Sequence, residues 1–212
     1  FMTAQKICRG RDLDPSMRLE MAKYVCAFAK YLRNAEGLPV HYVGCHNEGE
    51  DFARWPDDGT DTPHHQNHDY NMWWTPEAVA EFLPLVREVL DRNDMRDVGV
   101  TPGETSNWTR FHTWGYADAI AENDAAMEAL DLITSHGFAG FTPGPWFGDW
   151  RSAGIDIIRQ RKPSLHAWVT STSWAKMDVL FAWEMFGSIY AAKVNGIIPW
   201  ALVQNPPLWV GG

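Results

Sequence analysis

The stretch VGCHNEGE at residues 43–50 joins a short apolar run to a string of polar and acidic residues. Val40, Tyr42 and Val43 favour a strand, because β-branched and aromatic residues suit a half-buried pleated surface. Residues 16–36, just before it, carry apolar side chains at spacings of three and four, which is typical of an amphipathic helix. The sequence therefore predicts a helix, then a buried strand, then a loop that opens with groups able to do chemistry.

The same alternation of helix and strand continues to the end of the chain. Helices are expected from Thr75 and over 116–130, 153–161 and 179–194, and strands over 97–101, 132–135, 166–170 and 196–202. Because each parallel connection between strands needs a crossover, which a helix supplies, this alternation predicts a parallel sheet.

The five expected strands end in loops that carry polar or aromatic residues. These residues are Glu48, Glu104, His136, Ser171 and Trp200. A (β/α)8 barrel places its active site at the C-terminal ends of its strands, whereas a doubly wound sheet offers one crevice. The sequence therefore predicts an α/β fold of the (β/α)8 TIM-barrel type.

Composition excludes several classes of partner. The formal net charge is -9, and Lys and Arg do not cluster, so no nucleic acid is expected. No run of about 18 apolar residues predicts a membrane span, and no signal peptide is visible. No strand is followed by a glycine-rich phosphate loop, and no cofactor is expected. The three cysteines lack metal or disulfide spacing and are expected to be free thiols.

Five separate motifs resemble those of clan A glycoside hydrolases, most closely family 30 and its relatives. The motifs are VGCHNEGE at 43–50, RGR at 9–11, WWTPE at 73–77, SHG at 135–137 and IPW at 198–200. In that clan an Asn-Glu pair ends strand four, where the Glu is the general acid/base and the Asn holds the 2-hydroxyl of the sugar. The resemblance implies these roles for Glu48 and Asn47. It also implies a β-linked poly- or oligosaccharide substrate and an extracellular or periplasmic location.

The resemblance spans strand four to strand eight of the barrel. Residues 1–212 are then a single catalytic domain of about the last five β/α units, in which strands one to three are missing. Such a piece has two unpaired parallel edges, which are expected to promote self-association or to need a partner fragment. The alternative is a smaller α/β protein with five strands and no relation to carbohydrates.

One position departs from the resembled family. At the end of strand seven the family carries its nucleophile in an aromatic-x-Thr-Glu string, and this chain has WVTST at 168–172, with Ser171 in place of the Glu. Serine has no charge with which to stabilise an oxocarbenium-like transition state. Three interpretations stay open. The change inactivates the site; another carboxylate, Glu104 or Glu50, acts as a base toward water and the reaction inverts the anomeric configuration; or the alignment of this chain with the family is shifted.

The remaining candidates are substrate contacts. His136 is expected to touch substrate or a carboxylate, although a buried core histidine is the alternative. Trp200 is expected to form the floor of the sugar subsite, as the resemblance implies, and Trp108 is a second stacking candidate beside Glu104.

Two further points concern what the site binds. The His-rich loop at 57–69, with histidines between 64 and 68, matches neither a zinc nor a calcium spacing, and a rim loop beside Trp55 and Trp73 is preferred to a metal site. Two functions stay open: a glycoside hydrolase that uses Glu48, and a catalytically inactive carbohydrate-binding barrel.

Overall fold

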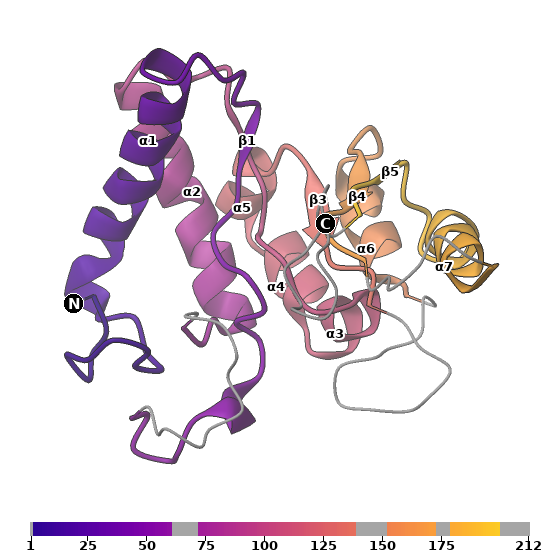
Figure 1. Cartoon of the computed structure of the whole chain (residues 1–212), viewed down its shortest axis with the longest axis horizontal. Coiled ribbons are helices and arrows are strands. Elements are labelled where there is room, and N and C mark those ends of the chain that lie inside the picture. The colour runs from indigo at the N-terminus through magenta and orange to yellow at the C-terminus, as the bar shows by residue number, and fades with distance from the viewer. Residues whose placement is uncertain (1, 61–71, 139–151, 173–178, 200–212) are drawn as a thin grey trace.

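The computed structural model describes residues 2–60, 72–138, 152–172 and 179–199, in which helices and strands alternate (Figure 1). The helices are α1 (Arg18–Asn34), α2 (Pro76–Arg92), α3 (Trp108–Thr113), α4 (Tyr116–Glu122), α5 (Asp124–Ala129), α6 (Gly154–Arg161) and α7 (Val179–Tyr190). The strands are β1 (Tyr42–Val43), β2 (Gly99–Val100), β3 (Ile133–Ser135), β4 (Ala167–Val169) and β5 (Gly196–Ile197). Short 3-10 turns cover Pro15–Met17 and Phe52–Arg54. The predicted alternation is confirmed.

Helix α2 shows how local sequence sets an element. The side chain of Thr75 accepts a hydrogen bond from the backbone N–H of Ala78 at 3.1 Å, and Pro76 occupies the first turn, where its missing N–H costs nothing. Its apolar stripe is buried against the core, with Phe82 and Leu83 at most 1% exposed. The predicted start of this helix is confirmed.

The helix expected over residues 116–130 is instead two helices, α4 and α5. Asn123 separates them with an extended backbone, φ -102° and ψ 107°, and its side chain accepts a hydrogen bond from the N–H of Ala126 at 3.0 Å. Asn competes with helical hydrogen bonding through its own side chain, so it ends one helix and begins the next. Helix α3, which was not expected, begins in the same way with Asn107 capping Arg110.

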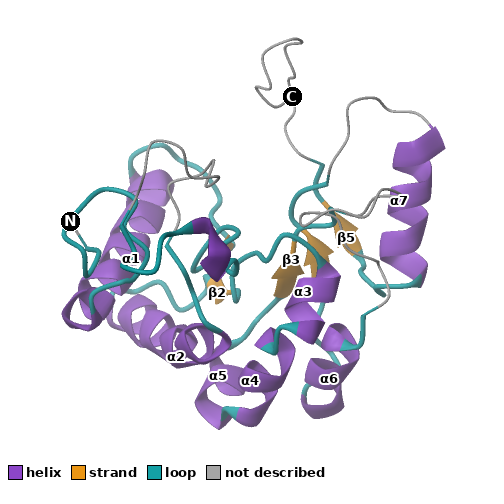
Figure 2. Cartoon of the chain, turned by 90° about the horizontal axis from the view of Figure 1, so that it is seen from below, coloured by secondary structure: helices purple, strands orange, loops and turns teal. Residues whose placement is uncertain are grey.

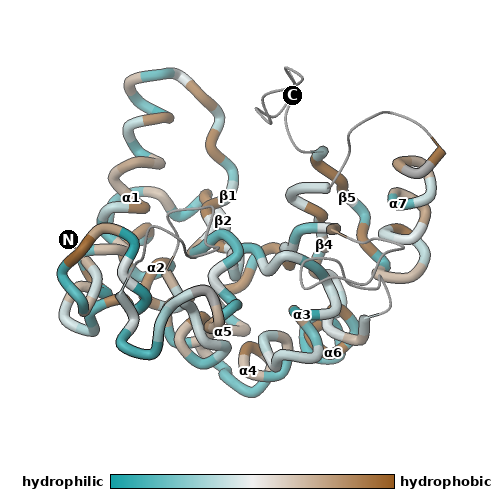
Figure 3. Tube along the Cα trace, turned by 60° about the horizontal axis from the view of Figure 1, so that its bottom comes forward, coloured by the Kyte–Doolittle hydropathy of each residue, from teal (hydrophilic) through white to brown (hydrophobic). Residues whose placement is uncertain are grey.

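All strand pairs are parallel, as predicted. Tyr42 lies opposite Gly99, Ile133 opposite Ala167 and Trp168 opposite Gly196, and a bridge from Val100 to Leu130 links β2 to the segment that enters β3. β1 and β2 form a two-stranded sheet and β3, β4 and β5 a three-stranded sheet, and the strands follow chain order within each, without the reversal that marks a doubly wound fold. Figure 2 shows α2, α4, α5 and α6 on one side of the strands, and Figure 3 shows α1 and α7 at the two ends of this arc of helices.

The two sheets come together on a concave face, where side chains of β1 and β4 touch. The ring of Tyr42 in β1 meets the ring of Trp168 in β4 edge-on, with centroids 5.6 Å apart. Gly99 and Gly196 make room for these rings, because a Cβ would lie 2.6 Å from Tyr42 at the first position and 2.4 Å from Trp168 at the second. The aromatic pair lies on the concave face, where Tyr42 is still 38% exposed, so the two rings cover only part of this face.

The two outermost helices present apolar side chains to solvent. On α1, Tyr24 is 61% and Phe28 is 53% exposed, and on α7 Phe186 is 57% and Tyr190 is 71% exposed. Isolated exposed apolar residues are ordinary, but here they recur on the two helices that lack an outer neighbour among the described residues. The arc is therefore apolar at both of its open ends.

Two composition-based expectations can be compared with the described residues. Cys8, Cys26 and Cys45 are free, as predicted, and the last two are buried. Within the described part of the chain, no helix combines the length and the apolar character that a bilayer crossing requires.

Candidate functional site

The loops that follow β1, β2 and β3 lie side by side at the C-terminal end of the sheet. Asn47 and Glu104 form a parallel bridge, and the N–H of Glu48 donates to the carbonyl of Glu104 at 2.7 Å. The N–H of His136 donates to the carbonyl of Thr105 at 2.9 Å. Backbone hydrogen bonds thus hold three of the expected site residues, Glu48, Glu104 and His136, on adjoining segments.

Ser171 belongs to the next segment of the same row. Its carbonyl accepts a hydrogen bond from the N–H of Gly137 at 2.7 Å, so the loop after β4 is attached to the loop after β3. The side chain is buried, and its hydroxyl has no hydrogen-bond partner among the described residues. The neighbouring hydroxyl of Thr172 is also buried and also has no hydrogen-bond partner among the described residues. The end of β4 therefore offers two buried hydroxyls, and residues 170–172 include no carboxylate.

Glu48 and His136 form the most direct contact in this row. The Oε1 of Glu48 lies 3.0 Å from Nδ1 of His136, and the two residues are 3% and 7% exposed. Glu48 has a left-handed backbone with φ 47°, which is uncommon for a residue other than glycine. Asn47 beside it is exposed. The carboxyl group of Glu48 is therefore buried against the imidazole of His136, whereas the side-chain amide of Asn47 faces solvent.

Glu104 reaches from β2 toward the concave face of the sheet. A Cβ placed on Gly44 would lie 3.7 Å from its Oε1. Burial raises the pKa of Glu104, while the charge interaction with His136 and the hydroxyl of Thr170 partly offset that rise. Glu104 keeps part of its surface open to solvent.

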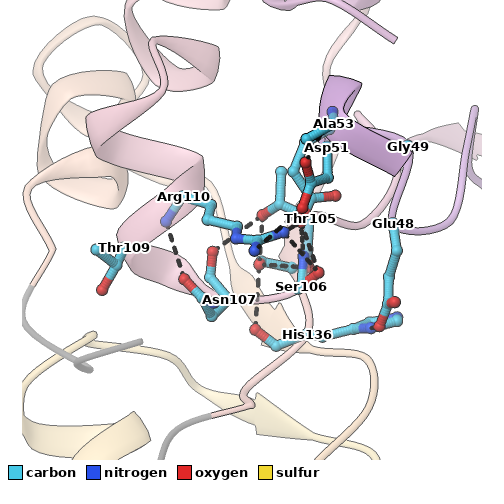
Figure 4. A network of polar contacts seen from close by, with 12 residues as sticks. Glu48, Gly49, Asp51, Ala53, Thr105, Ser106, Asn107, Thr109, Arg110 and His136 are labelled. Carbon is cyan, nitrogen blue, oxygen red and sulfur yellow. Dashed lines mark hydrogen bonds and ion pairs between the residues drawn. The ribbon is translucent and has the colours of Figure 1, made fainter. Parts of the chain in front are cut away.

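Glu50 anchors the loop that carries Glu48 to Ser106 and Arg110, two residues that Figure 4 labels. One of its oxygens accepts hydrogen bonds from the N–H and the hydroxyl of Ser106 at 2.9 and 2.5 Å and from the guanidinium of Arg110 at 2.8 Å. Burial alone would raise the pKa of Glu50, but these hydrogen bonds lower it overall. Glu50 is therefore a buried anion that holds two loops together, and it is poorly suited to be the base that the sequence left open.

His46 is a second histidine at this end of the strands and is partly buried. Its ring stacks on Trp74 with centroids 6.0 Å apart, and its Nδ1 accepts the N–H of Gly49 at 3.3 Å. Burial lowers the pKa of His46 to about 4, against an opposing influence of Glu50, and the nearby His136 lowers it further. The imidazole is neutral at pH 7 and acts as a hydrogen-bond acceptor that shapes the loop.

Several expected contacts differ from the structure or lie beyond it. Trp108 is 1% exposed and packs edge-on against Phe111, so the expectation that it stacks on a sugar is corrected: its ring belongs to the core. Trp200 and the histidines at 64–68 lie outside the described residues. In the described ranges, no group of three or more His, Cys, Asp or Glu residues is placed to hold a metal ion.

Sequence reasoning missed Ser106 and Arg110. Each is an ordinary residue in a loop or at a helix start, and its partner Glu50 lies more than fifty positions away in the chain. The Asn107 cap marks the start of α3, but a cap does not indicate which side chains of the helix face the core.

Comparison with solved structures identifies the fold. No family profile and no curated protein sequence matches this chain. A GH30 endoxylanase from Clostridium papyrosolvens aligns with a TM-score of 0.62 at 17% identity, over 94% of this chain and 44% of that one. The catalytic domain of GH30 xylanase C from Talaromyces cellulolyticus aligns with a TM-score of 0.63, with the same identity and coverage. The chain therefore has a GH30-like, glycosidase-like fold, and it spans less than half the length of these structures.

Proposed function

We propose that the chain is part of a glycoside hydrolase that cleaves O-glycosidic bonds of a β-linked poly- or oligosaccharide. The observation that carries the proposal is the buried Glu48 carboxyl, held 3.0 Å from His136 where the strand ends of a glycosidase-like fold come together. Glu48 is the general acid/base, and the exposed amide of Asn47 holds a sugar hydroxyl. Trp200 is proposed as the aromatic floor of the subsite.

The chemistry asked of Glu48 is protonation of the leaving oxygen. A buried carboxyl is suited to this, because proton donation in a water-poor site avoids competition with solvent. His136 holds the carboxyl in one orientation by accepting or donating a single hydrogen bond at Nδ1. General acid catalysis of this kind contributes typically about 100- to 10,000-fold in rate.

The described arc is proposed to be the last five β/α units of a (β/α)8 barrel within one domain. The apolar faces of α1 and α7 and the outer edges of β1 and β5 support this, since neighbouring units of a barrel would bury them. Where they are uncovered, the same edges favour self-association. An extracellular or periplasmic location is proposed on the family resemblance alone.

The test compares Glu48→Gln with Glu88→Gln, an exposed position on α2 remote from the site. Hydrolysis is followed on β-linked oligosaccharides and on activated aryl β-glycosides. Loss of the acid should lower kcat/KM by at least about 100-fold on the oligosaccharides and less on the aryl glycosides, whose leaving groups need little protonation. Equal activity of Glu48→Gln and Glu88→Gln on both substrates would refute the assignment.

A second candidate is a catalytically inactive carbohydrate-binding barrel, which the uncharged Ser171 favours. It predicts sugar binding without turnover in titration calorimetry, and loss of that binding in Trp200→Ala. Any turnover that depends on Glu48 would exclude it.

A further inference from the structure

Two adjacent residues, Thr105 and Ser106, hold both partners of the contact between Glu48 and His136. The N–H of His136 donates to the carbonyl of Thr105 at 2.9 Å, which fixes the backbone that carries the imidazole. Ser106 donates its N–H at 2.9 Å and its hydroxyl at 2.5 Å to the carboxylate of Glu50, which follows Glu48 closely in the chain. The imidazole and the loop that carries the carboxyl are therefore attached to the same short stretch between β2 and α3.

These hydrogen bonds close into a ring together with the 3.0 Å contact between Glu48 and His136. The ring passes from the side chain to the backbone of His136, then through Thr105 and Ser106 to Glu50, and returns along the chain to Glu48. A contact at the end of an open chain of hydrogen bonds can relax freely, whereas a member of a closed network moves only if other members move as well. The orientation of the Glu48 carboxyl thus depends on contacts in which it takes no direct part.

The backbone of Glu48 needs such support. Its φ of 47° lies in the left-handed region, which a residue other than glycine keeps only where its surroundings over-determine it. On one side the N–H of Glu48 donates to the carbonyl of Glu104 at 2.7 Å, and on the other the carbonyl of Gly49 accepts the N–H of Trp74 at 2.7 Å. Glu50 then closes the ring, so the chain is fixed on both sides of the carboxyl.

Arg110 gives the ring a charged anchor on helix α3. Its guanidinium donates to the same oxygen of Glu50 at 2.8 Å and lies 3.5 Å from the carboxylate of Asp51. Hydrogen bonds to an ionised carboxylate are about twice as strong as neutral ones. The side chains of Glu50 and Arg110 are 0% and 6% exposed, so water does not compete for these bonds. The strongest bonds of the ring therefore meet at Glu50.

We propose that Glu50, Ser106 and Arg110 are positioning residues, which act through this ring to hold the carboxyl of Glu48 where it can protonate the leaving oxygen. They are 3%, 0% and 5% exposed, so they do not reach substrate themselves. Proton transfer requires heavy atoms within about 2.6 to 3.2 Å of each other, so a loosened carboxyl loses rate mainly where the leaving group needs a proton. The inference rests on the proposed function and adds to it residues that the strand-end pattern does not include.

The first experiment measures amide hydrogen exchange by NMR in the unmodified chain and in Glu50→Gln, which removes the charge and keeps the shape of the side chain. The amides of Ser106 and His136 should exchange at least about 10-fold faster in the variant, because a hydrogen bond to a charged group of the ring has been weakened. The amide of Gly99, bonded to the carbonyl of His41 at 2.8 Å at the opposite end of the strands, should keep its rate. An unchanged rate at His136, or an equal acceleration at Gly99, would overturn the proposal.

The second experiment compares hydrolysis of β-linked oligosaccharides with that of activated aryl β-glycosides. In Glu50→Gln, kcat on the oligosaccharides should fall at least about 10-fold with little change in KM, and kcat on the aryl glycosides should fall much less, because their leaving groups need little protonation. A merely structural lesion lowers both rates alike. If the ratio of the two kcat values is the same in Glu50→Gln as in the unmodified chain, the proposal is overturned.

The matched control is Arg87→Met, a lesion at the opposite end of the strands. Arg87 pairs with Asp91 at 2.7 Å and donates to the carbonyl of Val98 at 2.6 Å, so its loss should lower stability and leave the ratio of kcat values unchanged. A ratio that shifts equally in Arg87→Met and Glu50→Gln would also overturn the proposal.

A milder variant covers the case in which Glu50→Gln does not fold. Ser106→Ala removes one hydroxyl contact and keeps the ion pair, so it should shift the exchange rates and the kcat ratio in the same direction by a smaller factor. If the unmodified chain turns over neither substrate, the exchange rate at His136 decides alone.

The two proposals fail separately. If Glu48→Gln keeps full activity on both substrates, the proposed function itself is wrong, whatever Glu50→Gln does. If Glu48→Gln loses activity on the oligosaccharides while Glu50→Gln keeps the kcat ratio of the unmodified chain, the hydrolase assignment stands and only the positioning role is overturned.

Discussion

Replacing Arg110 with methionine should destabilise the chain far more than replacing a charged residue on the surface. The side chains of Arg110 and Glu50 are 6% and 0% exposed, and their charged atoms are 2.8 Å apart. Removing one partner of a buried pair leaves the other charge buried without compensation, at a cost of about 3 to 5 kcal/mol. Loss of the contact between the guanidinium and the Trp114 ring, 4.4 Å from its centroid, adds to this.

Urea denaturation followed by circular dichroism measures the free energy of unfolding. The matched control is Arg18→Met, because the Arg18–Glu81 pair has side chains 41% and 57% exposed. Exposed pairs of this kind contribute up to about 1 kcal/mol. A loss below that level in Arg110→Met would refute the argument that Glu50 is a buried anion.

A double variant separates the orphaned charge from the lost packing. Glu50→Gln with Arg110→Met should be more stable than Arg110→Met alone, because the charge of Glu50 is then no longer buried without its partner. The deficit of Arg110→Met should also shrink as the pH falls, because protonation of Glu50 removes the uncompensated charge. A deficit that is the same at every pH would contradict the same reasoning.

Three further outcomes are expected. His136→Ala should lower kcat/KM by about 10- to 100-fold, because a hydrogen bond to a charged group contributes about 1.5 to 3 kcal/mol; steady-state kinetics measure this, and an unchanged value would show that Glu48 needs no such partner. Gly99→Val should lower the melting temperature through a loss of about 1 to 3 kcal/mol, since its side chain would collide with the ring of Tyr42, and an unaltered melting curve would contradict the packing described for the concave face. The depressed pKa of His46, about 4 against 6.5 for the free side chain, means that the unfolded chain binds a proton first, so stability should fall as the pH drops from 6.5 toward 4; an NMR titration midpoint near 6.5 would contradict this.

The sequence predicted the alternation of helices and strands because its signals are local. Thr75 and Pro76 mark the start of α2, and the apolar runs that lead to Glu48 and His136 mark buried strands. The break at Asn123 was missed, since the apolar spacing continues through it while the capping side chain decides the backbone. The helical spacing of the apolar residues therefore hid the capping signal of Asn123.

Contacts between distant positions could not be predicted in the same way. Nothing near Glu50 in the sequence indicates Arg110, and burial of the Trp108 ring depends on how α3 lies against the core. The strand-end rule nonetheless gave the row of Glu48, Glu104, His136 and Ser171, because parallel strands bring their C-terminal ends to one edge.

The aromatic contact between Tyr42 and Trp168 also bears on how the chain reaches its native state. The two residues are separated by more than half of the chain, so the contact forms only after a long loop has closed. Neighbouring units such as α1, β1 and α2 can assemble from short-range contacts well before that. Meeting of these two rings is therefore expected among the last steps of folding, and the concave face on which Glu104 lies takes its final shape only then.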